Sequence, residues 1–560
     1  MTISSRSRSR FRPRSSFLIP VAALALAALG ACNAIFGIEP GLPGGTTGTG
    51  GSSTASTGTT TSTTTGTETT TGSGPSCSAD AAAGTGAAIK LRLSGAGGND
   101  QVSALTHDSA GNLFAAGLFD GTSLTMGMPL AHVGAPDTDN AFVVKYDPSG
   151  AYLWGKAFGG TQDIRLNAGG TDAAGNVYLT GAVAGTAVIG PTTMTVPTDP
   201  SEPTLHYPDL LVLSLDPQGG VRWAKSFGTQ YIDRGLRIAV DPAGNSYVAG
   251  VSFDQVDFGT GLLGDHLSWW SFFLKLDSSG KVVWAQPVGN WDSDVTPDYV
   301  EFFEIAITLD TKGHAIIGGN FKGQVFLGND LVAPVGGTDA FVASLDASNG
   351  NVLWHQTFHQ PVGDPAPDGD QWITALTTDP CTGDVYAAGE FTQGIDFGSQ
   401  GGVKVSTGPA TSPDMFIARL SASDGTPIWA HEYGDAGLEE ITSVRVGPDG
   451  TVIFAGFLLD APSTVGVDFG LPIGFLKAAS PNPGPDYYSD VFLIKLDPAG
   501  NGLWGKRFGD KFAQAAFDVA VDEAGKIAIG GIVNGSITIG GGQPPLTAEG
   551  FDAFVARFDP

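Results

Sequence analysis

Short apolar segments alternate with Asp/Gly turns from about residue 100 to the end of the chain. The first half of the repeat is an apolar segment, an Asp-x-x-Gly-Asn turn and a second apolar segment that ends in glycine. Alternating apolar residues around a glycine-bearing tight turn predict a β-hairpin. Clear copies of the turn are Asp108–Asn112, Asp172–Asn176 and Asp241–Asn245, and weaker copies begin at Asp310, Asp379, Gly447 and Asp522.

The second half of the repeat predicts two further strands. It contains an Asp-x-Phe segment, another Asp-x-x-Gly turn and a Trp-x-x-x-Phe-Gly element, as in Phe142–Asp147 followed by Trp154 and Phe158-Gly159. The matching tryptophans are Trp154, Trp223, Trp284, Trp354, Trp429 and Trp504, with spacings of 69, 61, 70, 75 and 75 residues. Four strands plus loops in such an interval are typical of a β-propeller blade.

The ring must also close. The first half of the repeat occurs seven times, but the last copy reaches Asp559 without a fourth strand. A segment like a fourth strand, Ile89–Leu93, precedes the first copy instead. Because an incomplete blade leaves an unpaired strand edge, we predict that residues 87–97 complete the last blade. The fold class is then all-β, a single seven-bladed propeller of four-stranded blades over residues 87–560.

The repeat elements resemble those of the SBBP-type propeller repeats of exported bacterial proteins. The resemblance rests on Asp-x-x-Gly-Asn-x-Tyr, Phe-x-x-x-Leu-Asp and Trp-x-x-x-Phe-Gly, and it covers about residues 87–560. Many members of that family have no assigned activity. The Gly-x-x-Leu-Trp portion, as in Gly350–Trp354, is also similar to quinoprotein propeller repeats, which are catalytic in some proteins and outer-membrane assembly scaffolds in others.

The first 31 residues predict a secretory signal. A basic segment with five arginines precedes the apolar run 17–29, which is shorter than the roughly 20 residues of a membrane-spanning helix. The run ends in Leu29-Gly30-Ala31-Cys32, which resembles the lipobox of bacterial lipoproteins and implies cleavage before Cys32 and lipid attachment to its sulfur. Asn33 is unlike an inner-membrane retention signal, so we expect the outer membrane, at its periplasmic face or at the cell surface.

Residues 32–40 then form a lipid-anchored N-terminus, and residues 41–76 form a stalk. The stalk is almost entirely Gly, Thr and Ser, and such a segment cannot bury enough apolar surface to order itself. At 36 residues its flexible reach is roughly 30–36 Å.

Charge and motifs exclude several functions. The formal net charge of −28 argues against nucleic acid, whose phosphates require a Lys/Arg surface. The sequence contains no GxSxG, HExxH or Walker A motif and no zinc-type cysteine spacing. Besides Cys32, the chain has Cys77 and Cys381, which would pair in an oxidising compartment if the fold brings them together.

The long insertions are the most informative loops. With the Asp-x-x-Gly-Asn hairpin innermost, the loops between blades and the loops between second and third strands share one face, and the insertions at 188–208, 288–301, 358–371, 399–413 and 469–489 all belong to these classes. One-sided insertions are typical of a binding face. The candidate ligand-binding residues there are Trp269, Trp270, Trp291, Tyr299, Tyr207, Tyr487, Tyr488, Asp292, Asp294 and Asp368. Aromatic rings beside carboxylates suit either a glycan or a protein partner, or they only cover the loops themselves.

An acid precedes the first turn of most blades by eight or nine residues. The series is Asp100, Asp163, Asp233, Glu301, Asp370 and Glu439, with Gln514 in the seventh copy. At the start of the inner strands these side chains would ring the central channel. They would then bond to backbone N–H groups or share a cation such as Ca²⁺. We expect no other cofactor.

These patterns together predict a monomeric, membrane-anchored recognition or scaffold lipoprotein. Its partner would be a glycan or a protein bound by the long-loop face. The alternatives are an exported polysaccharide hydrolase or lyase, with acid and base drawn from pairs such as Asp292 and Asp368, and an outer-membrane assembly scaffold.

Overall fold

A computed structural model describes residues 84–94, 98–197, 207–264, 266, 269–288, 305–361, 369–407, 412–459, 466–479, 489–548 and 550–560. The predicted signal segment, Cys32, Cys77 and the stalk lie outside the described residues. Within the described part, no helix is long and apolar enough to cross a membrane.

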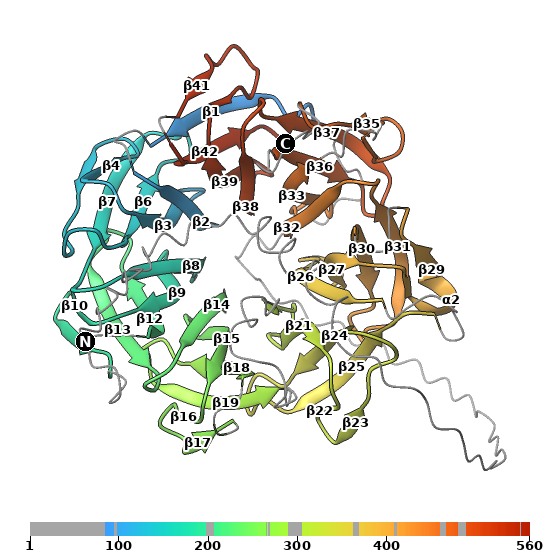
Figure 1. Cartoon of the computed structure of the whole chain (residues 1–560), viewed down its shortest axis with the longest axis horizontal. Helices are drawn as coiled ribbons and strands as arrows, with labels where there is room; N and C mark the ends of the chain where they lie inside the picture. Colours follow the sequence, from blue (N-terminus) through green and yellow to red (C-terminus); the bar gives the residue numbers. More distant parts are fainter. Residues whose placement is uncertain are drawn as a thin grey trace, which may run out of the picture.

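The described residues form seven four-stranded antiparallel sheets arranged as a ring, which confirms the predicted seven-bladed propeller (Figure 1). From the innermost strand outward, blade 1 comprises β2 (Asp100–His107), β3 (Leu113–Phe119), β6 (Asn140–Tyr146) and β7 (Tyr152–Phe158). Blade 2 comprises β8 (Ile164–Thr171), β9 (Val177–Val183), β12 (Asp209–Leu215) and β13 (Val221–Phe227). Blade 3 comprises β14 (Asp233–Val240), β15 (Ser246–Phe253), β18 (Trp269–Leu276) and β19 (Val282–Val288). Blades 4 and 5 comprise β20 (Ile305–Leu309), β21 (Ala315–Phe321), β24 (Asp339–Leu345) and β25 (Val352–Phe358); β26 (Gln371–Thr378), β27 (Val385–Phe391), β30 (Asp414–Leu420) and β31 (Pro427–Tyr433). Blades 6 and 7 comprise β32 (Leu438–Val446), β33 (Val452–Leu459), β36 (Asp490–Leu496) and β37 (Gly502–Phe508); β38 (Gln514–Val521), β39 (Ile527–Val533), β42 (Asp552–Phe558) and β1 (Ala88–Leu93).

A short two-stranded hairpin follows the second strand of each blade. The hairpins are β4 (Ser123–Thr125) with β5 (Pro129–Ala131), β10 (Thr186–Ile189) with β11 (Thr192–Thr195), β16 (Val256–Asp257) with β17 (Leu262–Leu263), β22 (Val325–Leu327) with β23 (Asp330–Val332), β28 (Gly394–Asp396) with β29 (Val403–Val405), β34 (Val467–Asp468) with β35 (Phe475–Leu476), and β40 (Ser536–Ile537) with β41 (Leu546–Thr547). The short helix α2 (Gly398–Gly401) joins β28 to β29.

The N-terminal strand closes the ring as predicted. β1 pairs antiparallel with β42, with Ala88 opposite Phe558. The two chain ends also form hydrogen bonds where the other blades have a turn between the third and fourth strands. The N–H of Gly86 donates to the carbonyl of Pro560 (3.3 Å), and the N–H of Asp559 donates to the carbonyl of Ala87 (2.9 Å). The same backbone bond from Asp497 to Asn501 (2.8 Å) closes the continuous turn of blade 6.

Each Asp turn is fixed by its own side chain. In the first turn, Asp108 Oδ1 accepts the backbone N–H groups of Ala110 (3.1 Å) and Asn112 (2.9 Å), and Asn112 Nδ2 donates back to the carboxylate. Gly111 at the next-to-last turn position has φ +75°, a conformation that glycine adopts freely. These bonds account for the Asp-x-x-Gly-Asn pattern without a metal.

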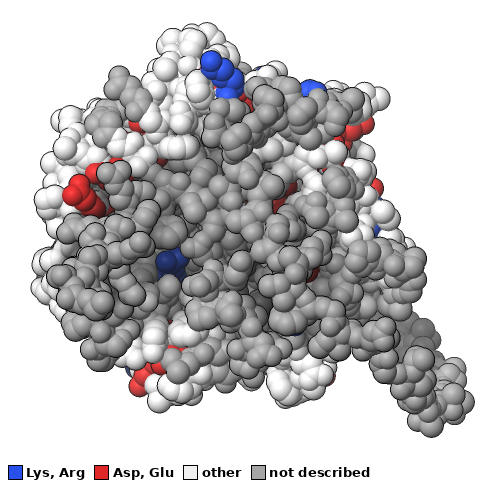
Figure 2. All heavy atoms as spheres, viewed as in Figure 1, with Lys and Arg blue, Asp and Glu red and all other residues white. Residues whose placement is uncertain are grey.

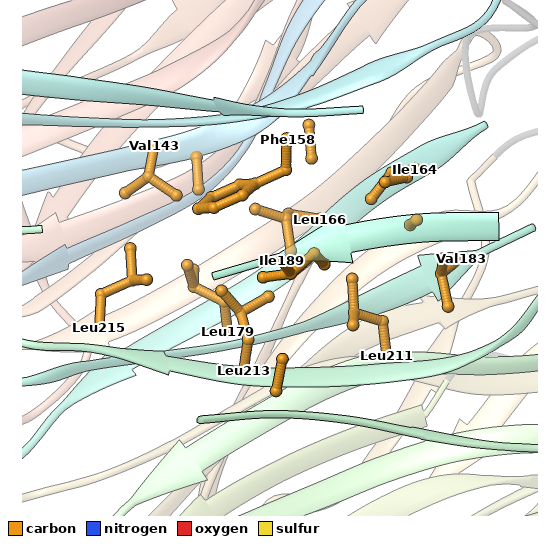
Figure 3. Packing of buried hydrophobic residues seen from close by; sticks show 14 of the residues in the cluster. Val143, Phe158, Ile164, Leu166, Leu179, Val183, Ile189, Leu211, Leu213 and Leu215 are labelled. Carbon is orange, nitrogen blue, oxygen red and sulfur yellow. The ribbon is translucent and has the colours of Figure 1, made fainter. Parts of the chain in front are cut away.

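The core consists of the faces that neighbouring blades press together, here called seams and numbered by the two blades. At seam 1/2, Phe158 of β7 points toward Leu166 and Ile189 of blade 2 (Figure 3), and these side chains are buried. Since a blade buries both faces in this way, its middle strands read as continuous apolar runs rather than strict alternation. Every residue of β3, β9 and β21 is buried.

The repeated tryptophans bond across the seams. Trp154 Nε1 donates to the carbonyl of Pro217 in the next blade (3.0 Å), as does Lys145 Nζ (3.3 Å). Equivalent indole bonds run from Trp223 to Ser278, Trp284 to Ala347 and Trp429 to Pro498, at 3.0, 3.1 and 3.3 Å. These four tryptophans therefore link blades 1, 2, 3 and 5 to the turn between the third and fourth strands of the next blade.

Candidate functional site

The two ends of the ring differ in their connections. The strand registers place the five- or six-residue turns within the hairpins of each blade at one end, here called the turn face. The short two-stranded hairpins and the inter-blade connections lie at the other end, here called the loop face. The prediction that both long-loop classes share one face is confirmed. The loop face is therefore the only end where blades carry long, individual insertions among the described residues.

Most of the candidate ligand-binding residues fall where the structure gives no description. Those outside the described residues are Trp291, Tyr299, Tyr487, Tyr488, Asp292, Asp294 and Asp368, together with Glu301 of the acid series. Tyr207, Trp269 and Trp270 are described, as are the remaining acids.

Trp269 and Trp270 are buried rather than exposed on a loop. Only 1% of Trp270 is accessible, and its Nε1 donates to the carbonyl of Asp254 (2.7 Å). Trp269 is 9% exposed. Both belong to β18, and Trp270 occupies the position that an Asp or Asn holds in the other third strands. Its ring packs in the hydrophobic core of seam 2/3. The expectation that Trp270 offers a free ring to a ligand is corrected by this burial.

Tyr207 belongs to a row of aromatic rings on the loop face at seam 2/3. Its ring lies 6.5 Å from that of Tyr231, Tyr231 lies 5.2 Å from Phe253, and Phe253 lies 5.3 Å from Trp269. Tyr207, Tyr231 and Phe253 are half-buried. We call these four residues the aromatic row. Sequence reasoning missed Tyr231 and Phe253, although both stand beside strand ends that face the loops.

Polar groups border the aromatic row. His266 Nδ1 lies 2.8 Å from Asp254 Oδ1, and the His266 side chain is 72% exposed. Asp254 follows Phe253 directly and adopts φ +119°, which is uncommon for a residue with a side chain. The row thus combines three half-buried rings and the buried ring of Trp269 with an exposed imidazole and a carboxylate.

Two buried carboxylates lie beneath the same seam. Asp209 at the start of β12 and Asp233 at the start of β14 face each other across Gly228, since a Cβ atom there would lie 2.3 Å from Asp209 Oδ1 and 2.8 Å from Asp233 Oδ2. Asp233 accepts the backbone N–H of Thr229 (2.7 Å) and the hydroxyl of Ser252 (2.5 Å), whereas Asp209 Oδ1 is buried without a hydrogen-bond donor among the described residues. Burial, followed by the neighbouring Asp233, raises the pKa of Asp209 to about 8, and burial raises the pKa of Asp233 to about 7.

The same arrangement recurs at other seams. A third-strand Asp approaches the first-strand acid or amide of the next blade in three further pairs: Asp552 with Asp100, Asp414 with Glu439, and Asp490 with Gln514. Burial raises the pKa of Asp100 to about 7 and the pKa of Glu439 well above its ordinary value. Because the pair repeats around the ring, it is part of the seam architecture and does not mark one special blade.

Asp163 and Asp370 bond to backbone across their seams. Each precedes its inner strand by one residue and is half-buried. Asp163 Oδ1 accepts the N–H of Asp139 (3.0 Å), and Asp370 Oδ1 accepts the N–H of Thr338 (2.8 Å). Among the described residues, the structure brings no group of three or more His, Cys, Asp or Glu side chains into metal-binding proximity. The described members of the acid series therefore lie at separate seams.

Cys381 lies in the first turn of blade 5 and is disulfide-bonded. The sequence has only two other cysteines, Cys32 and Cys77, and both lie outside the described residues.

Charged side chains do not form one continuous patch on the visible described surface. In Figure 2, the red and blue atoms of described residues are dispersed, mostly toward the rim of the face shown.

Comparison with known proteins does not show a family for this chain. No family model matches the sequence. An uncharacterized WD repeat-containing protein of Acanthamoeba polyphaga mimivirus is 22% identical over 469 residues, which are 77% of this chain and 29% of that protein. The chain thus spans less than a third of that relative's length.

Three solved structures match most of this chain at low similarity. They are Sqt1 from Chaetomium thermophilum (12% identity, TM-score 0.34, 85% of this chain and 99% of that one), a europium-containing methanol dehydrogenase (11%, 0.37, 84% and 93%) and the WD40 β-propeller domain of Doa1 (10%, 0.33, 84% and 96%). At these TM-scores the likeness carries no functional argument. The resemblance to SBBP-type repeats stays a prediction.

Proposed function

We propose that this protein is an exported, lipid-anchored recognition module that binds its partner through the loop face. The observation that carries the proposal is the aromatic row at seam 2/3, where half-buried rings reach the end of the propeller that, among the described residues, bears the individual insertions. A rigid ring of blades that presents variable loops on one end is a common basis for binding.

The attachment of the N-terminal segment supports this orientation. β1 begins opposite Phe558. Phe558 also lies opposite Ile527, which directly follows the turn that begins at Asp522, so β1 begins at the turn face. The described part of the chain therefore begins on the turn face, at Gly84. With a lipid on Cys32 and the stalk of residues 41–76 between, the loop face is the end free to meet a partner, on either side of the outer membrane.

Carbohydrate is the partner that the aromatic row favours. Tyr207, Tyr231 and Phe253 offer ring faces, and the neighbouring Asp254 and His266 offer groups that bond to hydroxyls. A protein partner is the other outcome of the test below, since tyrosines are also enriched at protein interfaces.

The enzyme alternative gains no specific support. The best-placed carboxylate pair with raised pKa values, Asp209 and Asp233, is buried to 4% and 1% exposure and has counterparts at other seams. A general acid must reach its substrate, and these groups lie beneath the backbone of Gly228.

The proposal is tested with the detergent-extracted full chain and a panel of immobilised polysaccharides. We expect retention on at least one glycan, no shortening of that glycan, and a loss of retention of at least tenfold for Tyr207→Ser combined with Tyr231→Ser. The matched control is Phe326→Ser, which removes a 65% exposed ring from the hairpin of blade 4.

Retention that survives the double substitution would move the binding site elsewhere. Absence of glycan retention together with capture of a defined outer-membrane protein through the same two tyrosines would assign a protein partner. Shortened glycan chains would establish an enzyme and overturn the proposal.

A further inference from the structure

Seam 7/1 differs from the other seams because β1 supplies the outer strand of blade 7. In β1, Lys90 lies opposite Arg557 of the third strand. In blade 1 the equivalent pair is Trp154 of the outer strand and Lys145 of the third strand. Lys90 thus stands where each of the other blades has its repeated tryptophan. Like Trp154 against Gly219, it packs against the turn glycine of the next blade, since a Cβ atom at Gly150 would lie 3.0 Å from Lys90 Cδ.

Three cations meet at this seam. Lys90, Arg92 and Arg557 line a small cavity of about 10 Å³ together with Tyr146 and Gly150. Burial, followed by the nearby charge of Arg92, lowers the pKa of Lys90. Within the described part of the chain, the one carboxylate within ion-pair distance of any of the three is Asp522, 3.7 Å from Arg557 Nη2. Such a cluster is unexpected in a chain with 28 basic and 56 acidic residues.

Several donors of the cluster are buried without an acceptor. Arg92 Nη2 donates to the carbonyl of Gly150 (2.8 Å), and Arg557 Nη1 donates to the carbonyl of Asp147 (2.9 Å). Arg92 Nε, Arg557 Nε and Arg557 Nη2 have no hydrogen-bond acceptor among the described residues, and Arg557 is only 3% exposed. A buried charged donor without an acceptor is costly, so these groups point to a missing negative partner.

His107 does not supply the missing charge. It lies at the end of β2 near Arg557, and burial followed by that guanidinium lowers its pKa to about 3. At neutral pH the imidazole is therefore uncharged. Tyr146 contacts the cluster only through the face of its ring. The guanidinium carbon of Arg92 lies 4.9 Å from the centroid of this ring.

We propose that this cavity binds a monovalent inorganic anion of chloride size between Arg92 and Arg557. A space of about 10 Å³ holds on the order of one water-sized particle, which favours a monatomic anion over phosphate, sulfate or an organic carboxylate. The anion accepts the free N–H groups and reduces the repulsion among the three cations. It therefore stabilises the seam that adjoins the blade in which β1 and β42 close the ring by hydrogen bonds alone.

The first test measures the thermal unfolding midpoint of the full chain as chloride replaces gluconate at constant ionic strength. We expect a saturable rise of roughly 1–3 °C between 5 and 200 mM chloride, with bromide equally effective. In the same titration, the ³⁵Cl resonance should broaden on addition of protein. A crystal grown with bromide should show an anomalous peak beside Arg92 and Arg557.

Substitutions then locate the effect. Arg92→Met should abolish the chloride-dependent shift and the broadening, whereas the control Lys156→Met should leave both unchanged. Lys156 is the residue of blade 1 that is equivalent to Arg92, because it lies opposite Val143 in the third strand as Arg92 lies opposite Val555. Its side chain is exposed.

Three results would overturn the proposal: a midpoint independent of the halide, a chloride effect that persists in Arg92→Met, or a bromide peak only elsewhere. If Arg92→Met does not fold, the wild-type ³⁵Cl broadening and the position of the bromide peak decide the question.

Discussion

The indole nitrogen of Trp154 lies 3.0 Å from the carbonyl oxygen of Pro217, which belongs to the next blade. The repeated tryptophan is thus a link between blades as well as a core residue. Its ring also packs edge-on against Phe114 of its own blade, with 5.9 Å between centroids.

Trp154→Phe should keep most of the ring packing and lose the bond to Pro217. We expect the free energy of unfolding to fall by about 1 kcal/mol, the usual net worth of such a bond, measured as a lower urea midpoint. Leu153→Ala, which truncates a 49% exposed neighbour, is the control and should change the midpoint little. Equal effects of the two substitutions would deny the bond any role in stability.

Asp209 makes the stability of the ring depend on pH. Its folded-state pKa, about 8, is raised above the ordinary value of 3.8, as is that of Asp233, about 7. The folded chain therefore holds more protons than the unfolded chain between about pH 4 and 8, so stability is full below that range and is lost as pH rises through the folded-state values.

We expect the thermal midpoint to decrease from pH 5 to pH 9. Asp209→Asn cannot ionise, so it should flatten this slope and stabilise the protein at pH 8 by about 1–2 kcal/mol. Asp257→Asn, on the exposed hairpin of the next blade, is the control. An unchanged slope in Asp209→Asn would show that other groups govern the pH dependence.

Gly228 is required by the carboxylate beside it. Gly228→Ala would place a Cβ atom 2.3 Å from Asp209 Oδ1, and we expect a loss of about 1–3 kcal/mol in unfolding free energy. The loss should shrink in an Asp209→Ala background, because the obstructing oxygens are gone. A double-mutant cycle of the four chains measures this coupling, and a coupling energy of zero would contradict the steric account.

Cys381 should be joined to Cys77. Cys381 is disulfide-bonded, and the other candidate, Cys32, carries lipid under the proposed function. Peptide mapping without reductant should recover a linked pair containing residues 77 and 381, and Cys381→Ser should lower stability by about 2–4 kcal/mol. Recovery of a Cys32 linkage would contradict both this pairing and the lipid anchor.

The blades were predictable because their signals are local. An Asp turn such as Asp108–Asn112 and a tryptophan such as Trp154 recur at intervals that only a four-stranded unit fits, and the missing last strand identified β1. The aromatic row was less accessible, because Tyr207, Tyr231 and Trp269 come together through strand ends from two blades.

The acid series shows the limit of spacing arguments. Asp100 and Asp233 stand eight residues before their turns, whereas Asp163 and Asp370 stand nine before theirs. In a strand, one residue moves a side chain to the opposite face, so the two groups have different partners. Those partners belong to the adjacent blade, as Asp209 does for Asp233, and no pattern within one repeat reveals them.

Two hydrogen bonds between the ends of the chain, formed by Asp559, Pro560, Gly86 and Ala87, take the place of a continuous turn in blade 7. In blade 6 the backbone hydrogen bond of this turn joins two residues of one continuous segment, whereas in blade 7 it joins the two ends of the described chain. The fold therefore fixes the order of the blades around the ring but not which blade comes first. A circular permutant that joins Pro560 to Thr85 and opens at the Asp497–Asn501 turn would contain the same seven seams. The tether would then leave from a different blade but from the same face of the ring.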